Sequence, residues 1–199
     1  MRIFLDLDGV LADFFGGVEL LYGVKFDPWP KRGAYWLADI MPNMTNEKFW
    51  HDTAGPTDGI EFWSELKVYP WANDLVKFAE DMAGPENVAF LTKPVLDPYC
   101  AAGKTMWVQK HFPEYSRRLL IGSCKEMCAS VDSVLIDDDE KNIEAFDKYG
   151  GHGILFPQPW NSALKFDIDS VYQQLGSAKI YIHSLTSHHE GCLPTWRTS

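Results

Sequence analysis

The first predicted strand of the chain is an apolar run that leads into two closely spaced carboxylates. Residues 2–6 read Arg-Ile-Phe-Leu-Asp, which is typical of a short buried strand, and Leu-Asp-Gly follows directly. Asp6 and Asp8 are therefore separated by one residue at the end of a hydrophobic strand, where a charge is costly unless a cation or a proton compensates it. A turn of solvated aspartates is the alternative, but such turns seldom close so hydrophobic a run. The pattern favours a functional acidic loop.

Composition limits the kinds of protein that this chain can be. With 199 residues, of which 46% are hydrophobic and 14% aromatic, it can bury a full core as one domain with a small insertion. Its formal net charge of -10 makes a nucleic acid polymer an unfavourable partner, because polynucleotide binding needs a basic surface. An anionic small molecule would therefore need local cations.

Neither membrane nor export signals are recognisable. No stretch has the apolar length of a membrane span, and Asp6 and Asp8 interrupt the N-terminal region where a signal peptide would be apolar. These features predict a cytoplasmic protein with no membrane partner. The cysteines form no dense framework, which predicts reduced thiols at Cys100, Cys124, Cys128 and Cys192.

Strand and helix patterns alternate over most of the chain. Further apolar strands are predicted at residues 87–92, 118–122, 133–137 and 153–156, and helices at 13–22, 75–82, 97–108, 139–149 and 169–175. Asp97 followed by Pro98 is typical of a helix start. Such alternation predicts an α/β fold with a parallel sheet that helices cover on both faces.

Residues 25–70 break the alternation. Prolines divide this segment into short pieces, two of which, 45–51 and 58–66, are predicted as short helices. The segment is too short for a large core of its own, although it is rich in tryptophan. This combination favours a lid over a substrate site, with tryptophans at positions 29, 36, 50 and 63.

Polar residues follow three of the predicted strands at the edge where parallel strands end. Ligands of such sheets bind at that edge, and it receives Asp6 with Asp8, Thr92, and Asp137 with Asp138. Hard oxygen ligands without histidine or cysteine suit Mg²⁺. One carboxylate could then attack phosphorus while its neighbour handles the proton of the leaving group, and a hydroxyl and a lysine would stabilise the charge.

The motifs resemble those of the haloacid dehalogenase superfamily. Residues 6–11, Asp-Leu-Asp-Gly-Val-Leu, are similar to its first motif, Thr92 to its second, and Asp137-Asp138 to its fourth. The resemblance implies a phosphatase in which Asp6 is the nucleophile that forms an aspartyl-phosphate and Asp8 is general acid and then base. It also implies Mg²⁺ held by Asp6, the backbone carbonyl of Asp8 and Asp137, with Asp138 in support.

Within the superfamily the chain most resembles the 5′(3′)-deoxyribonucleotidases, through about Trp160. Residues 8–14, 31–36 and 104–108 carry this likeness. It implies a Rossmann-like core with a small helical cap inserted after the first strand and helix. The expected division is residues 1–24 and 71–176 for the core, 25–70 for the cap and 177–199 for a C-terminal tail.

The same resemblance implies a set of substrate contacts, each with a plain structural alternative. Phe14, Tyr35 and Trp36 would surround the base, although Phe14 also lies on the apolar face of its helix and could simply belong to the core. Lys104 and Lys125 would lie near the phosphate. Only one lysine is needed for that role, and either could instead be solvated.

The chain departs from the family after two motifs. Lys93 follows Thr92 where these nucleotidases commonly have a small hydroxyl residue, so Lys93 either contacts phosphate or points into solvent. Asp139 follows Asp138 in place of an arginine-containing turn, and its position predicts a helix N-terminal residue rather than a ligand. The preferred base and sugar therefore stay open.

Three functions remain as hypotheses. The first is a Mg²⁺-dependent nucleotidase that acts on a nucleoside monophosphate; the second is a related phosphatase for sugar phosphates or a polynucleotide 3′-phosphate; the third is a non-catalytic phosphate-binding protein. For residues 179–199 a surface tail or a contact in a homodimer is favoured over a zinc site, because the histidines and Cys192 lack paired ligand spacing.

Overall fold

The computed structural model describes residues 1–189, with side chains to residue 185. At its centre lies a five-stranded parallel sheet in the order β3-β2-β1-β4-β5. The predicted parallel α/β sheet is confirmed, and every strand bound lies within one residue of its predicted place. The strands are β1 (Arg2–Leu5), β2 (Val88–Thr92), β3 (Leu119–Ile121), β4 (Ser133–Asp137) and β5 (His152–Leu155).

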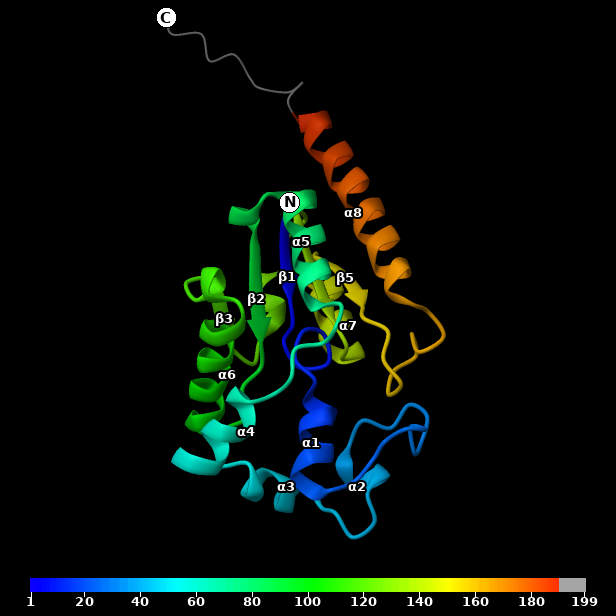
Figure 1. Cartoon of the computed structure of the whole chain (residues 1–199). Helices are drawn as coiled ribbons and strands as arrows, with labels where there is room; N and C mark the ends of the chain where they lie inside the picture. Colours follow the sequence, from blue (N-terminus) through cyan, green and yellow to red (C-terminus); the bar gives the residue numbers. More distant parts are fainter. Residues whose placement is uncertain (190–199) are drawn as a thin grey trace, which may run out of the picture.

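Helices cover both faces of the sheet (Figure 1). Alternate residues of β1 point to opposite faces, so that Ile3 and Leu5 pack among α5, α6 and α8 while Phe4 meets Phe146 of α7. A strand buried on both sides needs apolar residues throughout, which explains why the strands lack an alternating pattern. The helices are α5 (Ala72–Ala83), α6 (Pro98–His111), α7 (Glu140–Lys148) and α8 (Ile168–His189), with short 3₁₀ turns η2 (Pro85–Asn87), η3 (Pro113–Tyr115) and η4 (Lys125–Cys128).

Aspartate side chains cap the starts of α1, α6 and α7. Asp13 accepts the backbone N–H of Gly16 at 2.8 Å at the start of α1 (Phe14–Tyr22). Asp97 accepts the N–H of Tyr99 at 3.4 Å, and α6 begins at Pro98 as predicted. Asp139 likewise caps α7 by accepting the N–H of residue 141 at 3.0 Å, so its prediction as a helix N-terminal residue is confirmed.

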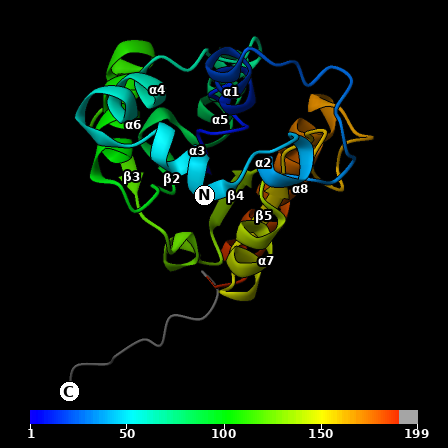
Figure 2. The same cartoon turned by 90° about the horizontal axis from the view of Figure 1, so that it is seen from below.

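Residues 25–70 form short helices beyond the carboxyl ends of the strands (Figures 1 and 2). They are α2 (Leu37–Ile40), α3 (Asn46–Asp52) and α4 (Ile60–Ser64), with a π-helical turn η1 (Gly55–Gly59) before α4. The predicted helix at 58–66 is thus replaced by two shorter pieces. Gly103 of α6 allows α4 to pack closely, because a Cβ there would lie 2.6 Å from the Cβ of Trp63. The indole of Trp107 also donates to the carbonyl of Leu66 at 2.7 Å.

The prediction that the last helix ends before Gly176 is wrong. Helix α8 continues to His189, because the buried face that Val171 and Leu175 form before the glycine continues beyond it to Ile182. A glycine inside a helix costs only about 1 kcal/mol, which this packing offsets. The rest of the predicted tail, with Cys192, lies outside the described residues. Within them, no helix combines the length and the apolar content that crossing a membrane requires.

Candidate active site

A tight turn after β1 presents the first pair of carboxylates. The carbonyl oxygen of Leu7 accepts the backbone N–H groups of residues 10–12 at 2.7–3.2 Å, and Gly9 has a φ of 76°. Asp6, which precedes the turn, is 6% exposed. A Cβ on Gly9 would lie 2.3 Å from Oδ2 of Asp138, so glycine is needed both for the turn and for the close approach of that carboxylate.

Three carboxylates meet where β1 and β4 end side by side. Oxygens of Asp6, Asp137 and Asp138 lie within 4.8 Å of one another, and all three residues are buried. Asn142 Nδ2 lies 3.0 Å from both carboxylate oxygens of Asp137, and the backbone N–H of Asp139 donates to one of them at 2.9 Å. The cluster is therefore held in place by hydrogen bonds from the start of α7.

A buried lysine lies against this cluster. Lys125, in the η4 turn, places Nζ 2.7 Å from Oδ1 of Asp6 and 2.6 Å from Oδ2 of Asp137. Its side chain is 1% exposed, so the ammonium has exchanged water for two carboxylates. This arrangement partly neutralises the acidic cluster.

A second buried lysine forms an ion pair with Asp8, the other carboxylate of the turn. Lys104 of α6 forms an ion pair with Asp8 and donates to Thr92 Oγ1 and to the carbonyl oxygen of Lys93, both at 2.9 Å. Its ammonium also lies 5.0 Å from the ring centre of Trp63. Lys125 and Lys104 are thus divided between the two aspartates, which the sequence did not reveal.

Burial and like charges raise the pKa values of two of the acids. The pKa of Asp6 rises from 3.8 to about 7, and burial of the carboxyl is the largest cause. The positive charge of Lys125 lowers this pKa, whereas the negative charges of Asp137 and Asp8 raise it. The pKa of Asp138 is raised well above its ordinary value by burial and then by its neighbours Asp137 and Asp6. Burial alone would lower the pKa of Lys125, but Asp137 and Asp6 outweigh it and raise the pKa.

We expect the protein stripped of metal ions to lose stability as the pH rises from about 4 to about 7. In this range the folded protein keeps a proton on Asp6 that the unfolded chain has released, because the folded pKa is raised from 3.8 to about 7. The stabilisation is complete below the lower value and is lost as the pH passes the upper one. Thermal unfolding midpoints in a chelator across this range will measure it. Asp6→Asn should show a smaller fall; an equal fall would contradict the assignment.

A pocket of about 130 Å³ opens onto the acids. Phe14, Tyr35 and Lys93, which the sequence offered as substrate contacts, are among the residues that line it. Trp36 is not among its lining residues; it is 47% exposed and its ring packs edge-on against Tyr35. The pocket is lined by Asp6, Asp8, Phe14, Tyr35, Trp50, Trp63, Lys93, Pro94, Val95, Asp138, Asp139 and Asn142.

The sequence left two alternatives for Phe14, core or substrate contact, and two for Lys93, phosphate contact or solvent. Phe14 is 6% exposed and packs against Phe49, Phe62 and Trp63, so it belongs to the core and also forms part of the pocket wall. Lys93 is exposed and also lines the pocket, where it donates to Oδ1 of Asn142, so it lies at the edge of the pocket in contact with solvent.

Several residues around the acids were not expected from the sequence. Trp50 and Trp63 line the pocket, and their position in a tryptophan-rich segment was the only sequence signal. Asn142, Trp160 and Asn161 all donate hydrogen bonds to Asp137 or Asp138. Asn142 lies in α7 only five residues after Asp137, whereas Trp160 and Asn161 come from the loop after β5, which meets the acids only in the folded chain.

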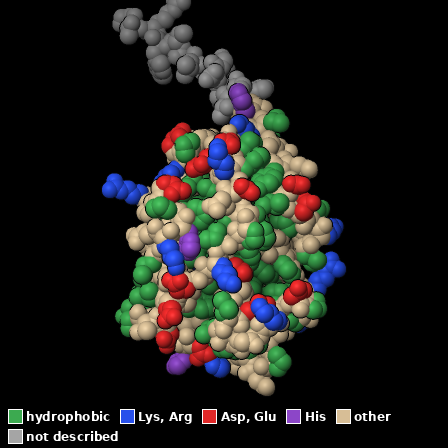
Figure 3. Space-filling model, in the orientation of Figure 1, with side chains coloured by type: hydrophobic (Ala, Val, Ile, Leu, Met, Phe, Trp, Pro, Cys, Tyr) green, Lys and Arg blue, Asp and Glu red, His purple; other side chains and the backbone are tan. Residues whose placement is uncertain are grey.

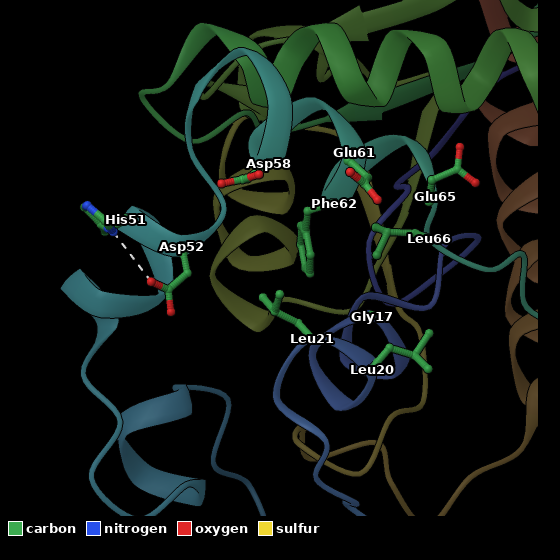
Figure 4. Close-up of a pocket in the computed structure, with 10 residues that line it drawn as sticks. All are labelled: Gly17, Leu20, Leu21, His51, Asp52, Asp58, Glu61, Phe62, Glu65 and Leu66. Atoms are coloured by element: carbon green, nitrogen blue, oxygen red, sulfur yellow. Dashed lines mark ion pairs between the residues drawn. The ribbon is translucent and has the colours of Figure 1, made fainter.

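A larger pocket of about 630 Å³ lies elsewhere and contains none of the predicted site residues (Figure 4). Leu20, Leu21, Phe62 and Leu66 provide its apolar side chains, and carboxylates stand around it. The volume of a pocket therefore does not by itself identify the candidate active site. Its lining residues are Gly17, Leu20, Leu21, His51, Asp52, Asp58, Glu61, Phe62, Glu65 and Leu66.

The parallel sheet, the acidic turn after β1 and the paired aspartates after β4 define a haloacid dehalogenase-like protein. Residues 1–179 match the family model described as 5′ nucleotidase, deoxy (pyrimidine), cytosolic type C protein, and the chain belongs to this family. The resemblance inferred from the motifs is thereby confirmed.

Individual relatives are just over one quarter identical to this chain over the residues that align. The mitochondrial 5′(3′)-deoxyribonucleotidase of Mus musculus is 29% identical over 153 residues, which cover 69% of this chain and 64% of that protein. The cytosolic-type enzyme of Homo sapiens is 27% identical over 149 residues, covering 70% and 71%. The chain thus spans less than two thirds of the length of the mitochondrial relative. Among solved structures, a haloacid dehalogenase-like hydrolase from Streptococcus pneumoniae aligns over 82% of this chain and 89% of that chain, at 14% identity and a TM-score of 0.49.

Proposed function

We propose that this chain is a Mg²⁺-dependent phosphomonoesterase that dephosphorylates (deoxy)nucleoside monophosphates through an aspartyl-phosphate on Asp6. The observation that carries the proposal is the division of two neighbouring aspartates between two environments. Asp6 lies in the carboxylate cluster beside Lys125, whereas Asp8 pairs with Lys104. Two acids with different partners can take different roles in one reaction. The names of the relatives support the choice of nucleotides.

The donor set fits a hard divalent cation. Asp6, Asp137 and Asp138 supply carboxylate oxygens within 4.8 Å of one another, and such oxygens are the ligands that Mg²⁺ prefers. Oδ1 of Asp8 is buried and accepts no hydrogen bond from any described residue, so the turn still has an unused acceptor beside the cluster. We propose these three carboxylates as ligands, with the backbone carbonyl of Asp8 as predicted from the family. The ion would neutralise negative charge on the carboxylates and on a bound phosphate.

The side chains of this protein would carry out the two chemical steps of the reaction. In the first step an oxygen of Asp6 bonds to phosphorus, the bond to the leaving oxygen breaks, and Asp8 gives that oxygen a proton. In the second step Asp8 takes a proton from water, whose oxygen attacks the aspartyl-phosphate and releases inorganic phosphate and Asp6. Thr92 accepts a hydrogen bond from Lys104 at 2.9 Å, so its own hydroxyl proton remains available to a phosphate oxygen. Lys125 and Lys104 stabilise the charge that develops.

The nucleoside would lie against the aromatic wall of the pocket. Phe14, Tyr35, Trp50 and Trp63 come from α1 and from residues 25–70, and aromatic faces suit a base. A volume of about 130 Å³ is small beside the roughly 300–1,000 Å³ typical of ligand sites. We therefore propose that residues 25–70 act as a cap that moves to admit the substrate. Trp36, which lies outside this wall, would contact a base only after such a movement.

The surface is consistent with a small substrate rather than a polymer. On the face seen in Figure 3, lysine and arginine side chains are interspersed with acidic ones and form no continuous basic patch. Because relatives of both a mitochondrial and a cytosolic type exist, a cytoplasmic location stays a prediction. A homodimer stays a prediction as well.

Phosphate release from a panel of monoesters will test the function. We expect the highest kcat/KM on deoxynucleoside monophosphates, loss of turnover in a chelator, and recovery with added Mg²⁺. The panel should contain 5′- and 3′-monophosphates of each base and several sugar phosphates. Faster turnover of a sugar phosphate than of every nucleotide would refute the substrate class and leave the mechanism standing. Full turnover in the chelator would refute the metal dependence.

A further inference from the structure

One indole N–H outside the predicted site reaches the acidic cluster. Trp160 lies in the loop that follows β5, is 6% exposed, and donates from Nε1 to Oδ2 of Asp138 at 2.6 Å. Tryptophan has a single donor and a rigid ring, so this bond fixes the direction of the carboxylate if the ring itself is held. The surroundings of the ring therefore decide what Trp160 does.

The loop around Trp160 is attached to both acidic turns. Asn161 Nδ2 donates to the carbonyl oxygen of Asp138 at 2.9 Å and to that of Phe156 at 2.8 Å. Gln158 donates to the carbonyl oxygen of Gly9. The loop thus joins the turn after β1 to the turn after β4. These hydrogen bonds fix the backbone from which the indole of Trp160 projects.

The ring of Trp160 packs against α1 and against residues 25–70. Its centre lies 4.5 Å from that of Phe15 and 5.1 Å from that of Trp29, and these two rings are themselves 4.7 Å apart. One side chain thus contacts a proposed metal ligand through its N–H and the proposed cap through its ring.

We propose that Trp160 is a positioning residue that orients Asp138 for the metal ion and connects the metal site to residues 25–70. Carboxylate ligands generally depend on such hydrogen-bonding partners, and removal of one typically weakens metal affinity about 10- to 100-fold. The inference rests on the proposed function, because it assumes that the cluster binds Mg²⁺.

The chain offers a matched control in the same aromatic cluster. Trp29 also packs on Phe15, but its indole donates at 3.2 Å to the carbonyl oxygen of Ala34 rather than to a carboxylate. Trp160→Phe and Trp29→Phe therefore remove the same atoms from neighbouring positions. Only the first removes a hydrogen bond to a proposed ligand.

Calorimetric titration of the metal-free proteins with Mg²⁺ will test the inference. We expect Trp160→Phe to raise the Mg²⁺ dissociation constant about tenfold or more, and Trp29→Phe to change it by less than about twofold. Tryptophan emission should respond to Mg²⁺ in the wild-type protein and in Trp29→Phe, and should lose most of that response in Trp160→Phe. Equal effects of the two substitutions on affinity and emission would overturn the proposal.

A third variant separates hydrogen bonding from packing. Trp160→His keeps a ring N–H, although it loses more side-chain volume than Trp160→Phe does. We therefore expect Trp160→His to bind Mg²⁺ more tightly than Trp160→Phe. Tighter binding by Trp160→Phe would overturn the proposal, even if either variant is less stable than the wild-type protein. If the wild-type protein bound no Mg²⁺ and released no phosphate, the proposed function would fail together with the inference. If it bound Mg²⁺ and all variants matched it, the inference alone would fail.

Discussion

Asp6→Asn is expected to lower kcat for nucleoside monophosphate hydrolysis by about 10⁴-fold or more, because the amide cannot form the acyl phosphate that a carboxylate forms. The change keeps the size of the side chain and removes a charge that is costly at this site, since burial raises the pKa of Asp6 to about 7. The folded structure should therefore persist. Single-turnover phosphate release together with a circular dichroism spectrum will separate lost chemistry from lost structure.

Asp139→Asn is the matched control for this experiment. Asp139 lines the same pocket, but its carboxylate caps α7, and asparagine is an equally good cap. We expect kcat to change by less than about tenfold. If both substitutions reduced turnover alike, the loss would come from the charge of the pocket and the assignment of Asp6 as nucleophile would be wrong.

The sequence predicted the sheet and the acidic edge because both depend on local patterns. Each strand is a short apolar run bounded by polar or turn residues, and a parallel sheet brings the ends of all its strands to one edge. The strand pattern therefore suffices to place Asp6, Thr92 and Asp137 at one edge of the sheet. Asp97 with Pro98 predicted the start of α6 for the same reason, since a cap acts within one turn.

Features that depend on packing between distant segments could not be predicted in this way. Lys104 and Lys125 lie 21 residues apart on different elements, and their division between Asp8 and Asp6 follows from where α6 and η4 meet the sheet. Trp50 and Trp63 face the pocket while Trp36 does not, because the orientation of short helices is set by their packing. Helix propensity alone predicts that α8 ends before Gly176, because propensity does not include the tertiary contacts that override it.

Lys125→Met is expected to destabilise the metal-free protein by about 3–5 kcal/mol at neutral pH, the usual result of removing one partner from a buried ion pair. The substitution keeps the length of the side chain and leaves Asp6 and Asp137 without the ammonium that lies 2.7 and 2.6 Å from their oxygens. Urea unfolding in a chelator will measure the loss. We also expect kcat to fall about 10²–10³-fold, because a preorganised cation is lost from the site.

Lys110→Met shows what the loss of an exposed pair should do. Lys110 lies 2.7 Å from Glu65, but the two side chains are 50% and 59% exposed, so the change should cost no more than about 1 kcal/mol. Mg²⁺ should restore part of the stability of Lys125→Met and none of that of Lys110→Met, because a bound cation replaces the missing charge only at the cluster. Equal destabilisation of the two variants, with no response to Mg²⁺, would show that Lys125 does not compensate the acids.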